Sequence, residues 1–160
     1  MSETLAITRI TPSECAPLRQ RVLRPMQRIE DCVYEHDLAP DAMHFGAFLG
    51  NTLIGVGSLT REACPDPADR DGYRLRGMAV YEAYRSTGVG AHLMTAMYEA
   101  LHAIPFTGTL WCNARTPAVP FYARHGWETY GEEFMTHPIG PHYRMWRSMS
   151  AVRKRQAEVA

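Results

Sequence analysis

The sequence predicts a single domain of the mixed α/β class, and three observations support this prediction. The chain has 160 residues, the length of one ordinary domain. Hydrophobic residues make up 46% of it and charged residues 21%, as in globular proteins. The spacing of apolar residues switches between strand and helix periods and predicts the order β-α-(α)-β-β-β-α-β-α-β-β. The β-α-β-α-β centre favours parallel pairing there, and the hairpin before it favours antiparallel strands beside it.

The first half of the chain predicts a strand, a helix and a β-hairpin. Thr11 can cap the first turn of the helix, with Pro12 at the first helical position and Glu14 placed to bond back to Thr11. Pro25 is expected to end or kink this helix, and Gly50-Asn51 tolerates the positive φ of a tight hairpin turn. The predicted segments are a strand over 5–10, the helix from 11, an irregular or short helical stretch over 28–40, and hairpin strands over 45–49 and 53–59.

The second half predicts the alternating part of the fold. Val89, Leu93, Met97 and Leu101 share one face of a predicted helix, which Pro105 closes. The predicted segments are an exposed loop over 61–72, strands over 73–80, 106–113, 127–134 and 142–149, and helices over 88–102 and 117–125, the latter with Gly126 as its C-cap.

Neither an internal repeat nor a change of composition divides the chain. We therefore predict that residues 1–150 form one domain. Arg153, Lys154 and Arg155 make residues 151–160 a basic C-terminal tail. A solvated tail is the favoured interpretation, with binding to phosphate or to a membrane surface as the alternative.

The charge balance and the cysteines exclude several classes of function. Lys plus Arg and Asp plus Glu number 17 each, whereas nucleic-acid binding usually comes with a basic excess. Signal-peptide and membrane-span patterns are both lacking. The four cysteines form no Cys-x-x-Cys pair, and His137 and His142 lack the spacing of a helical zinc pair. We expect a reduced cytoplasmic protein without nucleic-acid, membrane or metal partners.

The most informative segment is a glycine-rich turn between a predicted strand and a predicted helix. It runs Arg85-Ser86-Thr87-Gly88-Val89-Gly90-Ala91. The first N–H groups of a helix have no partner within it, and the helix dipole adds partial positive charge there. The turn therefore suits a phosphate or pyrophosphate, with the guanidinium of Arg85 as a further donor. The Lys of a P-loop and the third Gly of a dinucleotide-binding turn are both absent. A tight turn without a ligand is the alternative.

Two motifs in this order resemble those of the GCN5-related N-acetyltransferases. Arg85-Ser86-Thr87-Gly88-Val89-Gly90 matches the Arg/Gln-x-x-Gly-x-Gly/Ala signature, and 118–127 resembles the Ala-x-x-x-Tyr-x-x-x-Gly-Phe segment, with Trp127 in the aromatic place. Residues 131–134 and 140–142 look like a small bacterial branch of predicted acyltransferases. The resemblance covers most of 45–149. It implies a mostly antiparallel mixed sheet with a central parallel pair and flanking helices, and a homodimer would be ordinary for small family members.

The resemblance also implies an activity and a co-substrate. An acetyl group would pass from acetyl-coenzyme A to a primary amine of a small molecule or peptide, by direct attack in a ternary complex. The turn would wrap the pyrophosphate, and the strand before it would pair with the pantetheine arm. The implied coenzyme-binding residues are Met78, Ala79, Val80, Arg85, Ser86, Thr87, Gly88, Val89, Gly90, Ala91, Asn113, Pro117, Ala118, Phe121 and Tyr122.

Tyr122 is the predicted general acid. An ordinary phenol has a pKa of about 10, above the about 8.5 of a thiol, so Tyr122 could protonate the leaving thiolate. The resemblance implies the same role, and simple aromatic packing is the alternative. The candidates for the general base are Glu82, His44, His137, His142 and a chain of water molecules.

Several questions stay open. The acceptor should be recognised by the first helix with 28–40 and by the 61–72 loop. The acidic run of Glu30, Asp31, Glu35 and Asp37 is predicted to be a solvated face, although it could attract a cationic amine. Arg76 could instead bind an anionic group of the acceptor. A non-catalytic acyl-coenzyme-A-binding module and a nucleotide-binding protein are the alternatives to an acetyltransferase.

Overall fold

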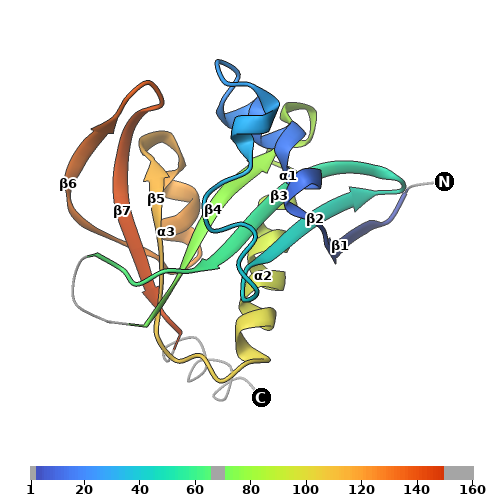
Figure 1. Cartoon of the computed structure of the whole chain (residues 1–160). Helices are drawn as coiled ribbons and strands as arrows, with labels where there is room; N and C mark the ends of the chain where they lie inside the picture. Colours follow the sequence, from blue (N-terminus) through green and yellow to red (C-terminus); the bar gives the residue numbers. More distant parts are fainter. Residues whose placement is uncertain (1–2, 66–70, 150–160) are drawn as a thin grey trace. The chain divides into compact units, whose positions relative to one another are not determined.

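The computed structural model describes residues 3–65 and 71–149 (Figure 1). The predicted tail over 151–160 and part of the predicted loop over 61–72 lie outside these ranges. The seven strands of the sheet follow the order β1-β2-β3-β4-β5-β7-β6. β4 and β5 pair in parallel, whereas β1–β2, β2–β3, β5–β7 and β6–β7 pair antiparallel. The predicted mixed α/β class, with one parallel pair in a mostly antiparallel sheet, is confirmed.

The chain divides into two compact units, which are described separately. Unit 1 comprises Met1–Thr60 and Arg76–Leu101, and unit 2 comprises Arg61–Leu75 and His102–Ala160. Unit 1 contains β1 (Leu5–Arg9), α1 (Pro12–Leu18), the π-helical η1 (Arg19–Leu23), the 3-10 helix η2 (Ile29–Cys32), β2 (Met43–Leu49), β3 (Thr52–Arg61), the end of β4 (Gly72–Val80), the 3-10 helix η3 (Glu82–Tyr84) and α2 (Val89–His102).

Local signals explain the boundaries in the first part of unit 1. The Thr11 hydroxyl accepts a hydrogen bond from Glu14 N at 3.2 Å, while Thr11 N donates to Glu14 Oε1 at 3.0 Å, which completes the predicted capping box. The helical segment ends at Leu23, before Pro25, because proline disfavours helical geometry in the residue that precedes it. Gly50 adopts a φ of +60° in the predicted hairpin turn.

The two helices α1 and α2 pack against successive residues of β3. Cys15 and Leu18 of α1 form a buried cluster with Val56 of β3. A Cβ atom on the neighbouring Gly55 would lie 2.8 Å from Cγ1 of Val89, at the start of α2. Successive residues of a strand face opposite sides of a sheet, so α1 and α2 cover opposite faces of this part of the sheet. The glycine allows the close approach of α2.

Unit 2 holds the remaining strands and a short helix. It contains the start of β4, β5 (Thr109–Arg115), the 3-10 helix η4 (Thr116–Ala118), α3 (Val119–Arg124), β6 (Glu128–Thr136) and β7 (Gly140–Ser148). The parallel pairing of β4 with β5 runs from Gly72↔Thr109 to Arg74↔Trp111. β7 lies between β5 and β6, so only the first of the two predicted β-α-β steps produces a parallel pair.

The predicted strand over 106–113 begins later than expected, at Thr109. Phe106 lies before the strand, and its ring packs edge-on against that of Tyr73 with the ring centroids 5.0 Å apart. Phe106 therefore contributes to the core and not to strand pairing. Gly126 follows α3 with a φ of +89°, as expected of a C-cap glycine.

Candidate active site

The glycine-rich turn lies in unit 1 between η3 and α2. Ser86 has a φ of +63° and is the one non-glycine residue with positive φ within 3–65 and 71–149. Gly88 follows with a φ of +90°. A non-glycine residue held in this conformation costs about 1–3 kcal/mol, and such residues cluster at ligand sites. The side chains of residues 85–88 are exposed, whereas Val89 is buried, so the turn is anchored by the helix that it opens.

Contacts within the turn fix its shape. Thr87 Oγ1 donates a hydrogen bond to the carbonyl of Tyr84, and His92 N donates to the carbonyl of Gly88 at 3.0 Å. Helix α2 has 14 residues, and the N–H groups of its first turn point toward this segment. The turn therefore combines backbone donors with the nearby Arg85, the arrangement that suits a pyrophosphate.

The strand before the turn has one buried and two partly exposed residues. Ala79 is buried in the cluster below α1, and Met78 and Val80 are partly exposed. Tyr81 N donates to Ile54 O at 2.8 Å, which ties the end of β4 to β3. Met78, Ala79 and Val80 therefore precede η3 and the turn within the same unit.

Tyr122 lies in α3 of unit 2 and is buried, with 6% of its surface exposed. Its ring packs edge-on against Phe121 at 5.2 Å and against Trp127 at 5.3 Å. Trp127 N also donates to the carbonyl of Tyr122 at 3.1 Å. These contacts hold the ring of Tyr122 in one position.

Asn113, on β5, carries an unsatisfied acceptor. Its Oδ1 atom is buried and has no hydrogen-bond partner among the described residues. A buried polar atom without a partner costs about 1–3 kcal/mol. A donor such as an amide N–H of a pantetheine arm would satisfy it. Pro117 and Ala118 follow in η4, where Pro117 is exposed and Ala118 caps α3.

Two of the predicted general bases have structural partners. His44 is buried, with Nδ1 2.7 Å from Ser58 Oγ and Nε2 2.9 Å from the carbonyl of Asp37. His142 is also buried and stacks on Phe134 at 5.8 Å. Both contact sets favour structural roles over proton transfer.

Glu82 forms an exposed ion pair with Arg21 at 2.7 Å. The hydrogen bond from Arg21 lowers the pKa of the Glu82 carboxyl below its usual range, which weakens it as a base. The other candidate, His137, is exposed.

The prediction of a solvated acidic run is wrong for Asp37. Glu30, Asp31 and Glu35 are exposed, but only 3% of Asp37 is exposed. Asp37 Oδ2 lies 2.6 Å from Nη1 of Arg19, which is itself fully buried. The partner explains the burial, because a buried carboxylate needs compensating charge and hydrogen bonds.

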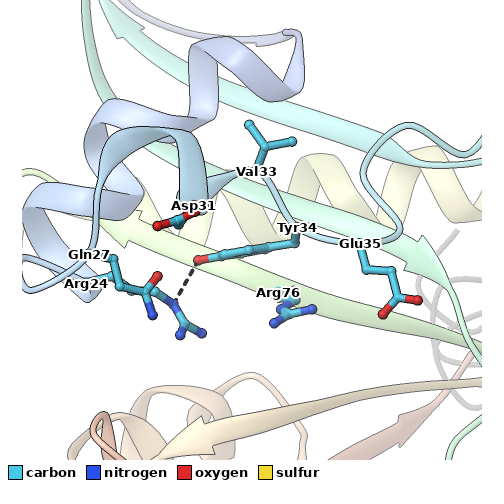
Figure 2. Close-up of a pocket in the computed structure, with 7 residues that line it drawn as sticks. All are labelled: Arg24, Gln27, Asp31, Val33, Tyr34, Glu35 and Arg76. Carbon is cyan, nitrogen blue, oxygen red and sulfur yellow. Dashed lines mark hydrogen bonds between the residues drawn. The ribbon is translucent and has the colours of Figure 1, made fainter.

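A pocket of about 430 Å³ lies in unit 1, at the segment where the acceptor was expected (Figure 2). Its lining consists of Arg24, Gln27, Asp31, Val33, Tyr34, Glu35 and Arg76. Arg24 Nε donates to Tyr34 Oη at 3.3 Å. Of these residues, the sequence indicated Arg76, Asp31 and Glu35 as candidates for binding the acceptor. It did not indicate Tyr34 and Arg24, because no local motif includes them.

The cysteines do not form a reactive or metal-binding group. All four are buried and reduced, and burial raises the pKa of the Cys112 thiol. A protonated, enclosed thiol is a poor nucleophile. Within 3–65 and 71–149, no group of three or more His, Cys, Asp or Glu residues could hold a metal ion. Over the same residues, no helix has the length and apolar character needed to cross a membrane.

Comparison with known proteins places these features in a family. Residues 17–145 match the family described as "Acetyltransferase (GNAT) domain". The "Uncharacterized N-acetyltransferase YitI" of Bacillus subtilis is 36% identical over 151 residues, which cover 93% of this chain and 99% of that protein. "Uncharacterized N-acetyltransferase YjcF" of the same organism is 32% identical over 113 residues, 69% of this chain and 74% of that protein.

Solved structures share the fold. Escherichia coli ElaA superimposes with a TM-score of 0.71 at 21% identity, covering 90% of this chain and 99% of that one. An aminoglycoside 6'-N-acetyltransferase complexed with coenzyme A gives 0.69 at 13% identity, covering 90% and 97%. The resemblance found in the two sequence motifs is thereby confirmed. The chain belongs to the GNAT family and is an acyltransferase of that type.

Proposed function

We propose that this protein transfers an acetyl group from acetyl-coenzyme A to a primary amine of a small molecule or peptide, by direct attack in a ternary complex. The observation that carries the proposal is the turn over 85–91, with its positive φ values at Ser86 and Gly88 and its place at the start of α2. Family membership supports acyl transfer in general, and the neighbour complexed with coenzyme A supports the co-substrate.

Three groups of residues would bind coenzyme A. The backbone N–H groups of 88–91, with Arg85, would bind the pyrophosphate. The backbone of Met78, Ala79 and Val80 would pair with the pantetheine arm. The buried Oδ1 of Asn113 would accept a hydrogen bond from a pantetheine amide, and Pro117, Ala118 and Phe121 would line the same arm.

The reaction requires the protein mainly to position the two substrates and to allow proton transfer. The neutral amine attacks the thioester carbonyl carbon, forming a C–N bond, and the C–S bond then breaks. Backbone N–H groups of 78–80 would stabilise the oxyanion, and holding the two substrates together supplies several kcal/mol of the barrier. Tyr122 would give its phenolic proton to the leaving thiolate. Water would take the proton of the amine, since His44 and Glu82 are engaged elsewhere.

The replacement Tyr122→Phe tests the proposal. It removes the proton donor and keeps the ring that packs on Trp127, so we expect kcat to fall about 10²–10⁴-fold while acetyl-coenzyme A still binds. Tyr130→Phe, at an exposed tyrosine of β6, is the matched control. The measurement is the rate of free thiol release with a panel of primary amines.

Two outcomes would change the conclusion. Unchanged turnover by Tyr122→Phe would remove the general-acid role. Tight binding of acetyl-coenzyme A without thiol release for any amine would favour the non-catalytic binding module. The homodimer and the cytoplasmic location stay predictions.

A further inference from the structure

The pocket is built around one tyrosine that three arginines approach. The guanidinium carbon of Arg19 lies 4.1 Å from the centroid of the Tyr34 ring, that of Arg76 lies 4.2 Å away and that of Arg24 5.2 Å away. Guanidinium groups are attracted to aromatic faces within about 6 Å. Figure 2 shows Arg24 at the hydroxyl end of Tyr34 and Arg76 beside its ring. The ring therefore holds these two cationic groups at the pocket.

A buried network fixes Tyr34 in place. Its backbone N–H donates to Asp37 Oδ2 at 2.6 Å, and Asp37 accepts from both Nη atoms of Arg19, at 2.6 and 3.2 Å. Arg19 also donates to the carbonyl of Cys32 and to Ser58 Oγ of β3, each at 2.9 Å. Segment 32–37 is thus tied to the sheet, and a site that is held in shape before binding loses less entropy on binding.

The charged side chains in and near the pocket differ in whether they form an ion pair. Arg19 is neutralised by Asp37 in the buried pair. Asp31 is engaged by Arg28 at 3.2 Å. Within the described ranges, Arg24 donates to Tyr34 Oη and is in no ion pair. The guanidinium groups of Arg24 and Arg76 face a pocket of about 430 Å³, which is large enough for a small metabolite.

We propose that Arg24 and Arg76 bind a carboxylate or phosphate group carried by the amine acceptor. This inference rests on the proposed acetyltransferase function and names its substrate class: a small amine that also bears an oxyanion. A guanidinium offers paired N–H donors that match the oxygens of carboxylate and phosphate groups.

Matched acceptors test the inference. We expect kcat/KM to be at least about 10-fold higher for 4-aminobutyrate than for n-butylamine, or for O-phosphoethanolamine than for ethanolamine, since hydrogen bonds to charged groups are stronger than those between neutral groups. The pair with the larger preference identifies the oxyanion. Arg24→Gln and Arg76→Gln should abolish that preference mainly through KM, and Arg24→Lys should retain part of it because it keeps the charge but loses the paired donors.

Arg21→Gln is the matched control. Arg21 also lies over a tyrosine ring, at 4.5 Å from Tyr81, but it is exposed and paired with Glu82. It should keep the preference of the wild type. All variants should show the same Tm increase with acetyl-coenzyme A, which separates a folding or coenzyme defect from the loss of oxyanion binding.

Calorimetric titration with 4-aminobutyrate and with O-phosphoethanolamine, in the presence of coenzyme A, gives a second readout that does not need turnover. Saturable binding of either by the wild type and by Arg21→Gln, lost in Arg24→Gln, supports the inference. Turnover of both amines of each pair at equal kcat/KM, or no binding of either oxyanion, would overturn it and leave the acetyltransferase function standing. No binding of acetyl-coenzyme A would contradict the proposed function instead.

Discussion

Arg19 and Arg21 lie two residues apart in the same helical segment, and each contacts a tyrosine ring and a carboxylate. Each lies over a tyrosine ring, at 4.1 Å from Tyr34 and 4.5 Å from Tyr81. Each pairs with a carboxylate, at 2.6 Å and 2.7 Å. The side chain of Arg19 is 0% exposed, however, whereas that of Arg21 is 53% exposed.

Burial, and not contact geometry, separates the roles of the two arginines. A buried charge that loses its partner is costly because water cannot replace the partner, whereas water and salt screen an exposed pair and leave it little net effect. Arg19 therefore holds the pocket segment against β3, and Arg21 belongs to the surface. The same distinction explains why Asp37 departs from the rest of its acidic run.

Replacing the buried Arg19 by Met is expected to have the largest effect on stability. The change leaves Asp37 buried without its ion-pair partner, and breaking such a pair costs about 3–5 kcal/mol. We expect Arg19→Met to lower the free energy of unfolding by about that amount in urea denaturation, whereas Arg21→Met changes it little. Adding Asp37→Asn to Arg19→Met should recover part of the loss. Equal losses for the two single arginine variants would contradict the comparison.

Gly77→Ala tests the packing around the buried Arg19 and should have an intermediate effect on stability. Gly77 has a φ of +65°, and a Cβ atom there would lie 2.7 Å from Nε of Arg19. Gly131 has a φ of +78° with nothing within 4 Å of its Cβ position, so Gly131→Ala carries the backbone strain alone. We expect Gly77→Ala to lose about 1–3 kcal/mol of unfolding free energy, and more than Gly131→Ala. A loss no greater than that of Gly131→Ala would show that Arg19 is free to move aside.

The exposed pair should give the smallest effect, and one that depends on pH. Arg21 lowers the pKa of the Glu82 carboxyl through a hydrogen bond, so the folded state favours the charged form. This stabilisation is present above the ordinary glutamate pKa of about 4.3 and is lost as the pH falls through the lower pKa of the folded state. The small Tm difference between wild type and Glu82→Gln should therefore shrink toward zero below that pKa, and also in high salt at neutral pH. A difference that grows on acidification would show that the sign is wrong.

Features set by neighbouring residues could be predicted from the sequence. The capping box at Thr11, the positive φ of Gly50, the helix after the glycine-rich turn and the turn itself depend on a few consecutive residues. Chain-distant pairing could not be predicted in the same way. β7 lies between β5 and β6 in the sheet, and no local sequence pattern in β5 or β6 indicates this pairing.

The contacts that hold the pocket segment in place could not be predicted from the sequence. The partner that buries Asp37 is Arg19, 18 residues away, and no short motif joins them. One signal was available: Arg19 follows Cys15 by one helical turn, on the apolar face with Leu18. An arginine at such a position requires a buried partner. For the coenzyme-binding residues and Tyr122, the sequence prediction stays a prediction.

The central claim, that the turn over 85–91 serves acetyl-coenzyme A, is tested most directly by ligand-dependent thermal unfolding. A ligand that binds only the folded state at 100 times its Kd adds about 2.7 kcal/mol of stability. At equal concentrations, acetyl-coenzyme A and coenzyme A should raise the Tm of the wild type more than ATP or NAD does. Gly88→Ala, at a φ of +90°, should reduce that rise. An equal or larger rise with ATP or NAD would contradict the account.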